Sequence, residues 1–165
     1  MAPLLLADLA HCSTAQIAPE LGFNCFEFQA NVGGRLVNVI DAAPEFVQGN
    51  ERPSGHGIPL LFPFPNRIRA GRFTWDGVDY ELPSETCPYD GTGNAIHGFC
   101  LDRPWRVIEQ GLSYAIGQFQ LSKDAPDRLA CWPADFLIEV RYEVRGTTLR
   151  CDILIANPTA AQVVA

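Results

Sequence analysis

The sequence lacks any cluster of basic residues. Its 165 residues carry 12 Lys plus Arg against 19 Asp plus Glu, which gives a formal net charge of -7 and an isoelectric point near 4.8. Proteins that bind nucleic acid neutralise its phosphates with grouped Lys and Arg side chains, whereas an acidic chain repels them. We therefore exclude a nucleic-acid partner.

Long hydrophobic runs are also missing. No stretch approaches the roughly 18 apolar residues that a membrane-spanning helix needs, so no membrane partner is expected. The short run Leu4–Leu6 has no basic residue before it and is followed closely by Asp8. These flanks make it a poor signal peptide, and we expect a cytoplasmic protein.

The six cysteines, at positions 12, 25, 87, 100, 131 and 151, include no C-x-x-C pair. Structural zinc sites usually contain such pairs, and small disulfide-stapled domains show tighter cysteine spacing. We therefore interpret the cysteines as reduced thiols, most of them buried, and expect neither a metal nor another cofactor.

What the chain does contain is enough apolar material for a core. Hydrophobic residues make up 47% of the sequence and charged residues 19%, which excludes a disordered chain. At roughly 150 residues per domain, the length fits one domain or part of a larger one. The 14 Gly and 13 Pro show no period, but they recur too often for long helices.

Alternation of apolar and polar residues predicts strands. From Phe136 to Val144 the apolar residues occupy every second position, Gly146-Thr147 follows as a turn, and Leu149, Cys151, Ile153 and Ile155 are expected to face inward on a partner strand. A second hairpin, over residues 72–82, turns at Asp76-Gly77, a pair typical of type I′ turns. Further strands are expected at Phe23–Gln29, Arg35–Asp41, Trp105–Glu109 and Ser113–Leu121. Many short strands without helical spacers predict an all-β, antiparallel β-sandwich.

Two segments do not fit strands. Residues 58–66 read IPLLFPFPN, and their three prolines exclude a central strand. Residues 81–99 form a long polar stretch, and a loop of that length is usually functional or mobile. The first segment leads to Asn66-Arg67, and thirty positions after Arg67 the second delivers His97-Gly98-Phe99.

These motifs together resemble the aldose 1-epimerase (galactose mutarotase) family. The resemblance rests on G-x-P-x-L-F-P from Gly57, N-R-I from Asn66, G-R-F from Gly71, and H-G-F from His97 followed by a tryptophan. It extends more weakly to WPADFLIEVRYEV and LRCDILIANPT. The order and spacing of the motifs are specific, although each triplet alone is unremarkable.

The resemblance implies a β-supersandwich enzyme that interconverts the α and β anomers of free hexoses without a cofactor. It implies that Arg67 binds the sugar, with Asn66 beside it, and that His97 is a catalytic residue that binds the ring or handles a proton. The family's general acid His and general base Glu would lie beyond Ala165. We therefore expect residues 1–165 to be the N-terminal portion of a single incomplete domain that is inactive and prone to associate on its own.

Less specific interpretations apply to several of these residues. Arg67 could be a solvated surface arginine, as we take Arg69 and Arg72 to be, and Asn66 could bond only within its own loop. His97 and Cys100 could suggest a metal site, but no second ligand pair accompanies them.

Other positions near these motifs receive weaker assignments. His11 and His56 are given no chemical role. Asp102-Arg103 is expected to form a local exposed ion pair of little energetic value. An exposed aromatic ring could stack on the sugar, and the candidates are Trp75, Phe99 and Trp105.

Two other functions remain open from the sequence. The first is a carbohydrate-binding β-sandwich without catalysis, in which the same residues only hold a sugar. The second is a glycan-acting hydrolase or lyase of similar fold, although nothing in the sequence points to the facing carboxylates that a glycosidase needs. A His motif and a late Glu after residue 165 would favour the isomerase.

Overall fold

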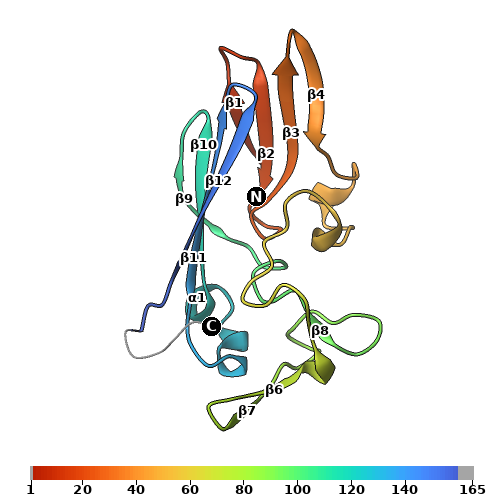
Figure 1. Cartoon of the computed structure of the whole chain (residues 1–165), viewed down its shortest axis with the longest axis vertical. Helices are drawn as coiled ribbons and strands as arrows, with labels where there is room; N and C mark the ends of the chain where they lie inside the picture. The colour runs from red at the N-terminus through yellow and green to blue at the C-terminus, as the bar shows by residue number, and fades with distance from the viewer. Residues whose placement is uncertain (1, 160–165) are drawn as a thin grey trace.

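Two four-stranded antiparallel sheets form the framework of the molecule (Figure 1), as the computed structural model of residues 2–159 shows. The first sheet has the order β1-β2-β3-β4, with strands Leu4–Asp8, Ser13–Ala18, Asn24–Val32 and Arg35–Ile40. The second has the order β12-β11-β10-β9, in which β9 is Arg106–Gln110, β10 is Tyr114–Gln120, β11 is Leu137–Arg145 and β12 is Thr148–Ala156. The predicted all-β antiparallel fold is confirmed.

Short elements lie mostly beside and beyond one end of the two sheets (Figure 1). The strand β5 (Arg67–Ile68) pairs with β8 (Ala95–Ile96), and β6 (Arg72–Trp75) pairs with β7 (Val78–Glu81). The helical elements are α1 (Leu121–Asp124) and 3-10 turns at Phe46–Gln48, Pro53–Gly55, Arg69–Gly71 and Pro126–Cys131. In the part of the chain that the structure describes, no helix has the length and apolar character to cross a membrane.

Both predicted hairpins are present. Asp76 and Gly77 have φ values of 49° and 75°, the pair of positive values that a type I′ turn requires. In the other hairpin Arg145 pairs with Thr148 across Gly146-Thr147, and buried and half-buried residues alternate along β11. The strands predicted at 23–29, 35–41, 105–109 and 113–121 also occur, with ends shifted by up to three residues.

The hairpin of β1 and β2 was not predicted from the sequence. The segment Leu4–Leu6 shows no alternation in sequence, because apolar residues occupy both the inward and the outward positions. Leu6 is fully buried, whereas Leu5 is exposed on this edge strand. In β2 a buried polar residue, Ser13, occupies an inward position, where its hydroxyl accepts a hydrogen bond from the Asn31 N–H at 3.1 Å. Polar residues inside and apolar residues outside cancel the period-two signal.

The prediction for the inner face of β12 is wrong in one respect. Ile153 and Ile155 lie opposite the buried residues Val140 and Ile138, so they are on the predicted face of the sheet. However, their side chains are 53% and 48% exposed, and Cys151 is exposed too. The sequence pattern identifies the face correctly, but among the described residues no second layer covers this edge strand.

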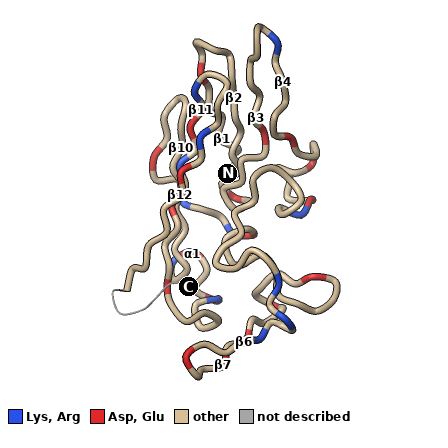
Figure 2. The backbone as a smooth tube through the Cα atoms, in the orientation of Figure 1, with Lys and Arg blue, Asp and Glu red and all other residues tan. Residues whose placement is uncertain are grey.

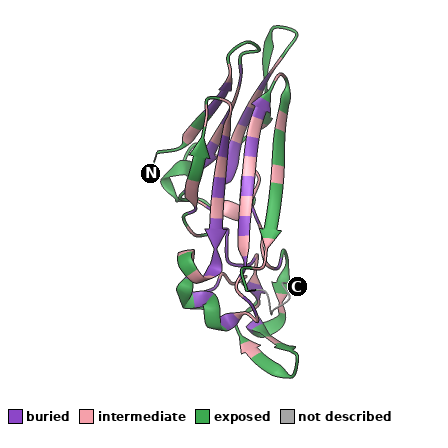
Figure 3. Cartoon of the chain, turned by 90° about the vertical axis from the view of Figure 1, so that its left-hand side faces the viewer, coloured by how far each residue is buried: buried purple, intermediate pink, exposed green. Residues whose placement is uncertain are grey.

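An aromatic stack joins the two sheets. The ring of Phe23, before β3, lies 5.7 Å from that of Trp105, before β9, and 5.8 Å from that of Tyr142 on β11. Gly117 on β10 makes room for it, because a Cβ there would lie 2.6 Å from the Phe23 ring. Figure 3 shows the buried residues alternating along the long strands. The indole N–H of Trp105 donates to the Cys100 carbonyl at 3.0 Å, so this core also holds the loop that follows His97.

Candidate functional site

The β5–β8 pair brings the two predicted site segments together. Arg67 is opposite Ile96 in the register, and the backbone N–H of His97 donates to the Asn66 carbonyl at 3.3 Å. Asn66, Arg67 and His97 therefore meet at one end of a two-residue ladder, although about thirty residues separate them in the chain. The structure shows that the backbone segments that carry them are adjacent, and their functional roles stay predictions.

The turn at His97 has an unusual backbone. His97 and Gly98 are consecutive residues with positive φ, 67° and 73°. A non-glycine residue in this region is uncommon, and such residues cluster at functional sites. Gly98 allows the turn to contact the proline-rich segment, because a Cβ there would lie 2.1 Å from the Phe62 carbonyl oxygen. The next residue fixes this contact, since the Phe99 N–H donates to the same oxygen at 2.7 Å.

A carboxylate that sequence reasoning did not select orients Arg67. Asp90 Oδ2 accepts a hydrogen bond from Arg67 Nε at 2.5 Å, and Asn66 Oδ1 accepts one from Arg67 Nη1 at 3.2 Å. The Arg67 side chain is nevertheless 55% exposed, so the outer part of the guanidinium faces solvent. The sequence signal was the turn-forming stretch DGTGN, in which an Asp bonds to its own backbone.

The electrostatic environment favours a neutral His97. Partial burial of the imidazole, and then the nearby Arg67 guanidinium, lower the pKa of His97 from its ordinary value. Both effects penalise the charged form. At neutral pH the ring therefore offers one N–H donor and one nitrogen acceptor, which suits contacts with sugar hydroxyls and a ring oxygen.

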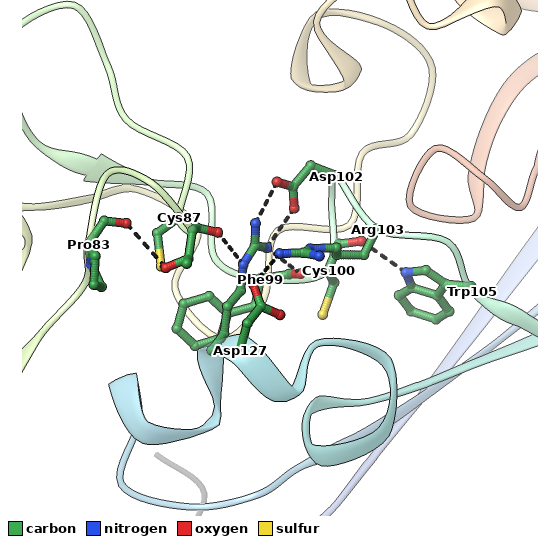
Figure 4. A network of polar contacts seen from close by, with 10 residues as sticks. Pro83, Cys87, Phe99, Cys100, Asp102, Arg103, Trp105 and Asp127 are labelled. Atoms are coloured by element: carbon green, nitrogen blue, oxygen red, sulfur yellow. Dashed lines mark hydrogen bonds and ion pairs between the residues drawn. The ribbon is translucent and has the colours of Figure 1, made fainter.

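Arg128, in the 3-10 turn Pro126–Cys131, binds the loops of the site through the network of polar contacts that Figure 4 shows around Phe99 and Asp102. Its side chain is almost completely buried, and its two terminal nitrogens each donate to one Asp102 carboxylate oxygen at 2.7 Å. It also donates to the Phe99 carbonyl at 3.0 Å and to the Thr86 carbonyl. Arg128 thus fixes the backbone on both sides of the His97 turn. Nothing in the local sequence distinguishes this arginine.

The predicted local pair Asp102-Arg103 is wrong. Asp102 binds Arg128 instead, while Arg103 pairs with Asp127 at 2.6 Å. Adjacent residues extend in different directions here, so each charge meets a partner from the 126–131 turn. Arg72, assigned to the surface, pairs with the exposed Glu81 at 3.0 Å. Figure 2 shows basic and acidic positions interspersed along the chain.

Two of the three candidate stacking aromatics are unavailable to a ligand. Phe99 is fully buried and Trp105 nearly so, and both pack in the core. Trp75 is 42% exposed, beside the turn of the β6–β7 hairpin. Trp132, which sequence reasoning did not consider, is half-buried and packs at 5.1 Å from the Phe73 ring of that hairpin.

Metal ligands do not gather at the site. Within residues 2–159 there is no group of three His, Cys, Asp or Glu side chains placed to hold a metal ion. Cys100, three positions after His97, is fully buried, and burial raises the pKa of its thiol well above the ordinary value. All six cysteines are free, four of them buried and two, Cys12 and Cys151, exposed.

Comparisons with known proteins point to one family. The sequence model of the family "Aldose 1-epimerase" matches residues 27–164. A galactose mutarotase-like protein from Clostridium acetobutylicum superimposes with a TM-score of 0.72 at 23% identity, covering 95% of this chain and 49% of that one. A putative aldose 1-epimerase from Escherichia coli K12 gives 0.68 at 14% identity, covering 96% and 47%.

A curated relative, the uncharacterized protein YihR of Escherichia coli, is 36% identical over 59 residues, which is 36% of this chain and 18% of YihR. The matching part of the chain thus covers less than half the length of each of these three proteins.

Proposed function

Because this chain belongs to the aldose 1-epimerase family, we propose that the protein carrying it interconverts the α and β anomers of a free hexose. Arg67 and Asn66 bind sugar hydroxyls, and His97 contacts the reacting end of the ring. The observation that carries this proposal is the adjacency of Asn66, Arg67 and His97 at the β5–β8 ladder.

The chemistry of ring opening supports this division of roles. The C1 hydroxyl must lose a proton while the ring oxygen gains one, so two groups must act on opposite sides of the hemiacetal. Each well-placed acid or base contributes roughly 10²–10⁴-fold. Arg67 cannot exchange protons near neutral pH, but its planar set of donors orients hydroxyls. A neutral His97 can accept or donate a hydrogen bond at the ring.

The remaining groups are expected outside residues 1–165. A general acid His and a general base Glu in that part are an expectation from the family resemblance, so the proposal concerns the complete protein. We also propose a cytoplasmic location. It would keep the exposed thiols of Cys12 and Cys151 reduced.

Polarimetry of freshly dissolved α-glucose or α-galactose tests the proposal. The complete protein should speed the approach to the equilibrium rotation, and His97→Ala should reduce that rate by about 10²-fold or more. His11→Ala is the matched control, because His11 binds Asp8 in the first hairpin and should leave the rate unchanged.

Two results would contradict the proposal in different ways. A complete protein that binds hexose without accelerating mutarotation would be a carbohydrate-binding sandwich. Normal acceleration by His97→Ala would leave the epimerase assignment intact and remove His97 from the mechanism.

A further inference from the structure

Asp90 sits at the centre of a closed polar loop. Its Oδ1 accepts hydrogen bonds from the Thr92 N–H at 2.9 Å, the Thr92 hydroxyl at 2.9 Å and the Asn94 N–H at 3.0 Å. The Asp90 N–H in turn donates to the Asn94 carbonyl at 2.9 Å. Only 9% of the Asp90 side chain is exposed, so this carboxylate is held in one orientation.

The same loop is fastened to the chain next to Arg67. Asn94 Oδ1 accepts a hydrogen bond from the Ala70 N–H at 3.1 Å, and Asn94 directly precedes β8, which pairs with β5. The loop therefore cannot move away from Arg67 without breaking both contacts. Its position relative to the β5 backbone is fixed before any ligand arrives.

The second oxygen of Asp90 faces Arg67. Oδ2 accepts from Arg67 Nε, and the weaker contact with Asn94 Nδ2, at 3.4 Å, is its other partner among the described side chains. A guanidinium has five N–H donors. Asp90 and Asn66 take one each, and among residues 2–159 no acceptor is recorded for the other three. The guanidinium is thus held at Nε and at Nη1, and its remaining donors are one N–H on Nη1 and two on Nη2.

We propose that Asp90 is a positioning residue for Arg67: it fixes the plane of the guanidinium so that the outer N–H donors point at the bound monosaccharide. The inference rests on the proposed function, which it deepens. An unrestrained arginine side chain would lose rotamer freedom when it binds the sugar. Asp90 removes most of that cost in advance, so its contribution appears in substrate binding and not in the chemical step.

Asp90→Asn separates this role from the role of the loop. The Asn side-chain oxygen can still accept from Thr92 and Asn94, whereas its NH₂ group now faces Arg67 Nε–H and cannot accept. The loop should keep its shape while the guanidinium is released. Asp90→Ala removes both functions. Asp79→Asn is the matched control, because Asp79 is an exposed carboxylate that accepts from Thr74 on the β6–β7 hairpin.

The first measurement needs no sugar. In the complete protein labelled with ¹⁵N-arginine, Arg67 should give an Nε–H signal that exchanges slowly with water, assigned by its loss in Arg67→Lys. Asp90→Asn should speed that exchange at least tenfold, and Asp79→Asn should leave it unchanged. The midpoint of thermal unfolding should stay close to wild type in Asp90→Asn and fall in Asp90→Ala.

The second measurement is the kinetics of mutarotation with hexose. We expect Asp90→Asn to raise KM about tenfold, the loss of roughly one charge-assisted hydrogen bond to the sugar, with kcat within about threefold of wild type. An unchanged Nε–H signal in Asp90→Asn overturns the proposal, and so does a faster exchange with an unchanged KM. If the wild-type protein does not accelerate mutarotation, the proposed function fails. The inference is then decided by hexose affinity, which must fall in Asp90→Asn for positioning to stand.

Discussion

The two sheets and the site region, residues 58–104, are stabilised by different interactions. The sheets have continuous ladders of backbone hydrogen bonds and a core of buried apolar side chains. The site region has two short ladders, at β5–β8 and β6–β7, together with isolated bridges and polar side chains that bind backbone groups. In the sheets the backbone hydrogen bonds form regular ladders, whereas in the site region the side chains of Asp90 and Arg128 add to scattered backbone bonds.

This difference has a functional consequence. A regular ladder restricts its residues to extended φ and ψ angles, so it could not present a residue in the left-handed conformation of His97. Buried side-chain clamps tolerate irregular backbone, but each clamp depends on one residue. The site region should therefore be sensitive to single polar substitutions that a sheet would tolerate.

Removal of the Arg128 clamp should give the largest effect. Arg128→Met would leave the buried Phe99 carbonyl and the partly buried Thr86 carbonyl without this donor and Asp102 without its partner, at a cost of about 3–5 kcal/mol. Arg103→Met is the control. Its pair with Asp127 is partly exposed, so its loss should cost less than about 1 kcal/mol. Urea unfolding measures both, and equal costs would show that burial of the clamp is not what stabilises this region.

The contact at Gly98 should come next. Gly98→Ala combines a positive φ with a Cβ directed at the Phe62 carbonyl, and we expect a loss of about 3 kcal/mol in the free energy of unfolding. Gly93→Ala separates the two causes, because Gly93 also has a positive φ but open space around it. That variant should lose only about 1 kcal/mol. A similar loss in both variants would mean that backbone conformation alone, and not the close approach, decides the cost.

The exposed edge of the second sheet should give the smallest change in stability. Ile153→Lys places a charge on an exposed position and should change the free energy of unfolding by no more than about 0.5 kcal/mol. It should nevertheless reduce the association expected of residues 1–165 expressed alone, since apolar edge strands pair with other chains. Light scattering after gel filtration measures this. Val140→Lys, at the paired buried position, should instead prevent folding. A monodisperse monomer for the unsubstituted chain would contradict the expectation.

What could be predicted from the sequence follows the same division. The local sequence predicts the structure of two segments. In residues 136–144 apolar and polar residues alternate, and Asp76-Gly77 is a dipeptide that favours positive φ. The family motifs identify Asn66, Arg67 and His97 as neighbours, which spacing alone would not. Burial of β12 could not be predicted, because alternation shows which residues share a face but not whether another layer covers it.

The clamps were missed for a physical reason. Asp90 reaches Arg67 across 23 residues and Arg128 reaches Thr86 across 42. The stretch DGTGN signals the turn around Asp90 but not its distant partner, and Arg128 has no local signal at all. Asp102 shows the opposite error. An adjacent opposite charge, Arg103, suggests a local pair, but each of the two residues binds a partner in the 126–131 turn.

The left-handed backbone at His97 restricts which amino acids could ever occupy that position. Valine, isoleucine and threonine are branched at Cβ and disfavour such a φ, whereas asparagine and glycine adopt it readily. The backbone conformation at position 97 therefore limits which amino acids are tolerated there, independently of the chemistry of the side chain. Histidine meets the conformational requirement as well as the chemical one, because it is among the few non-glycine residues that are enriched at positive φ.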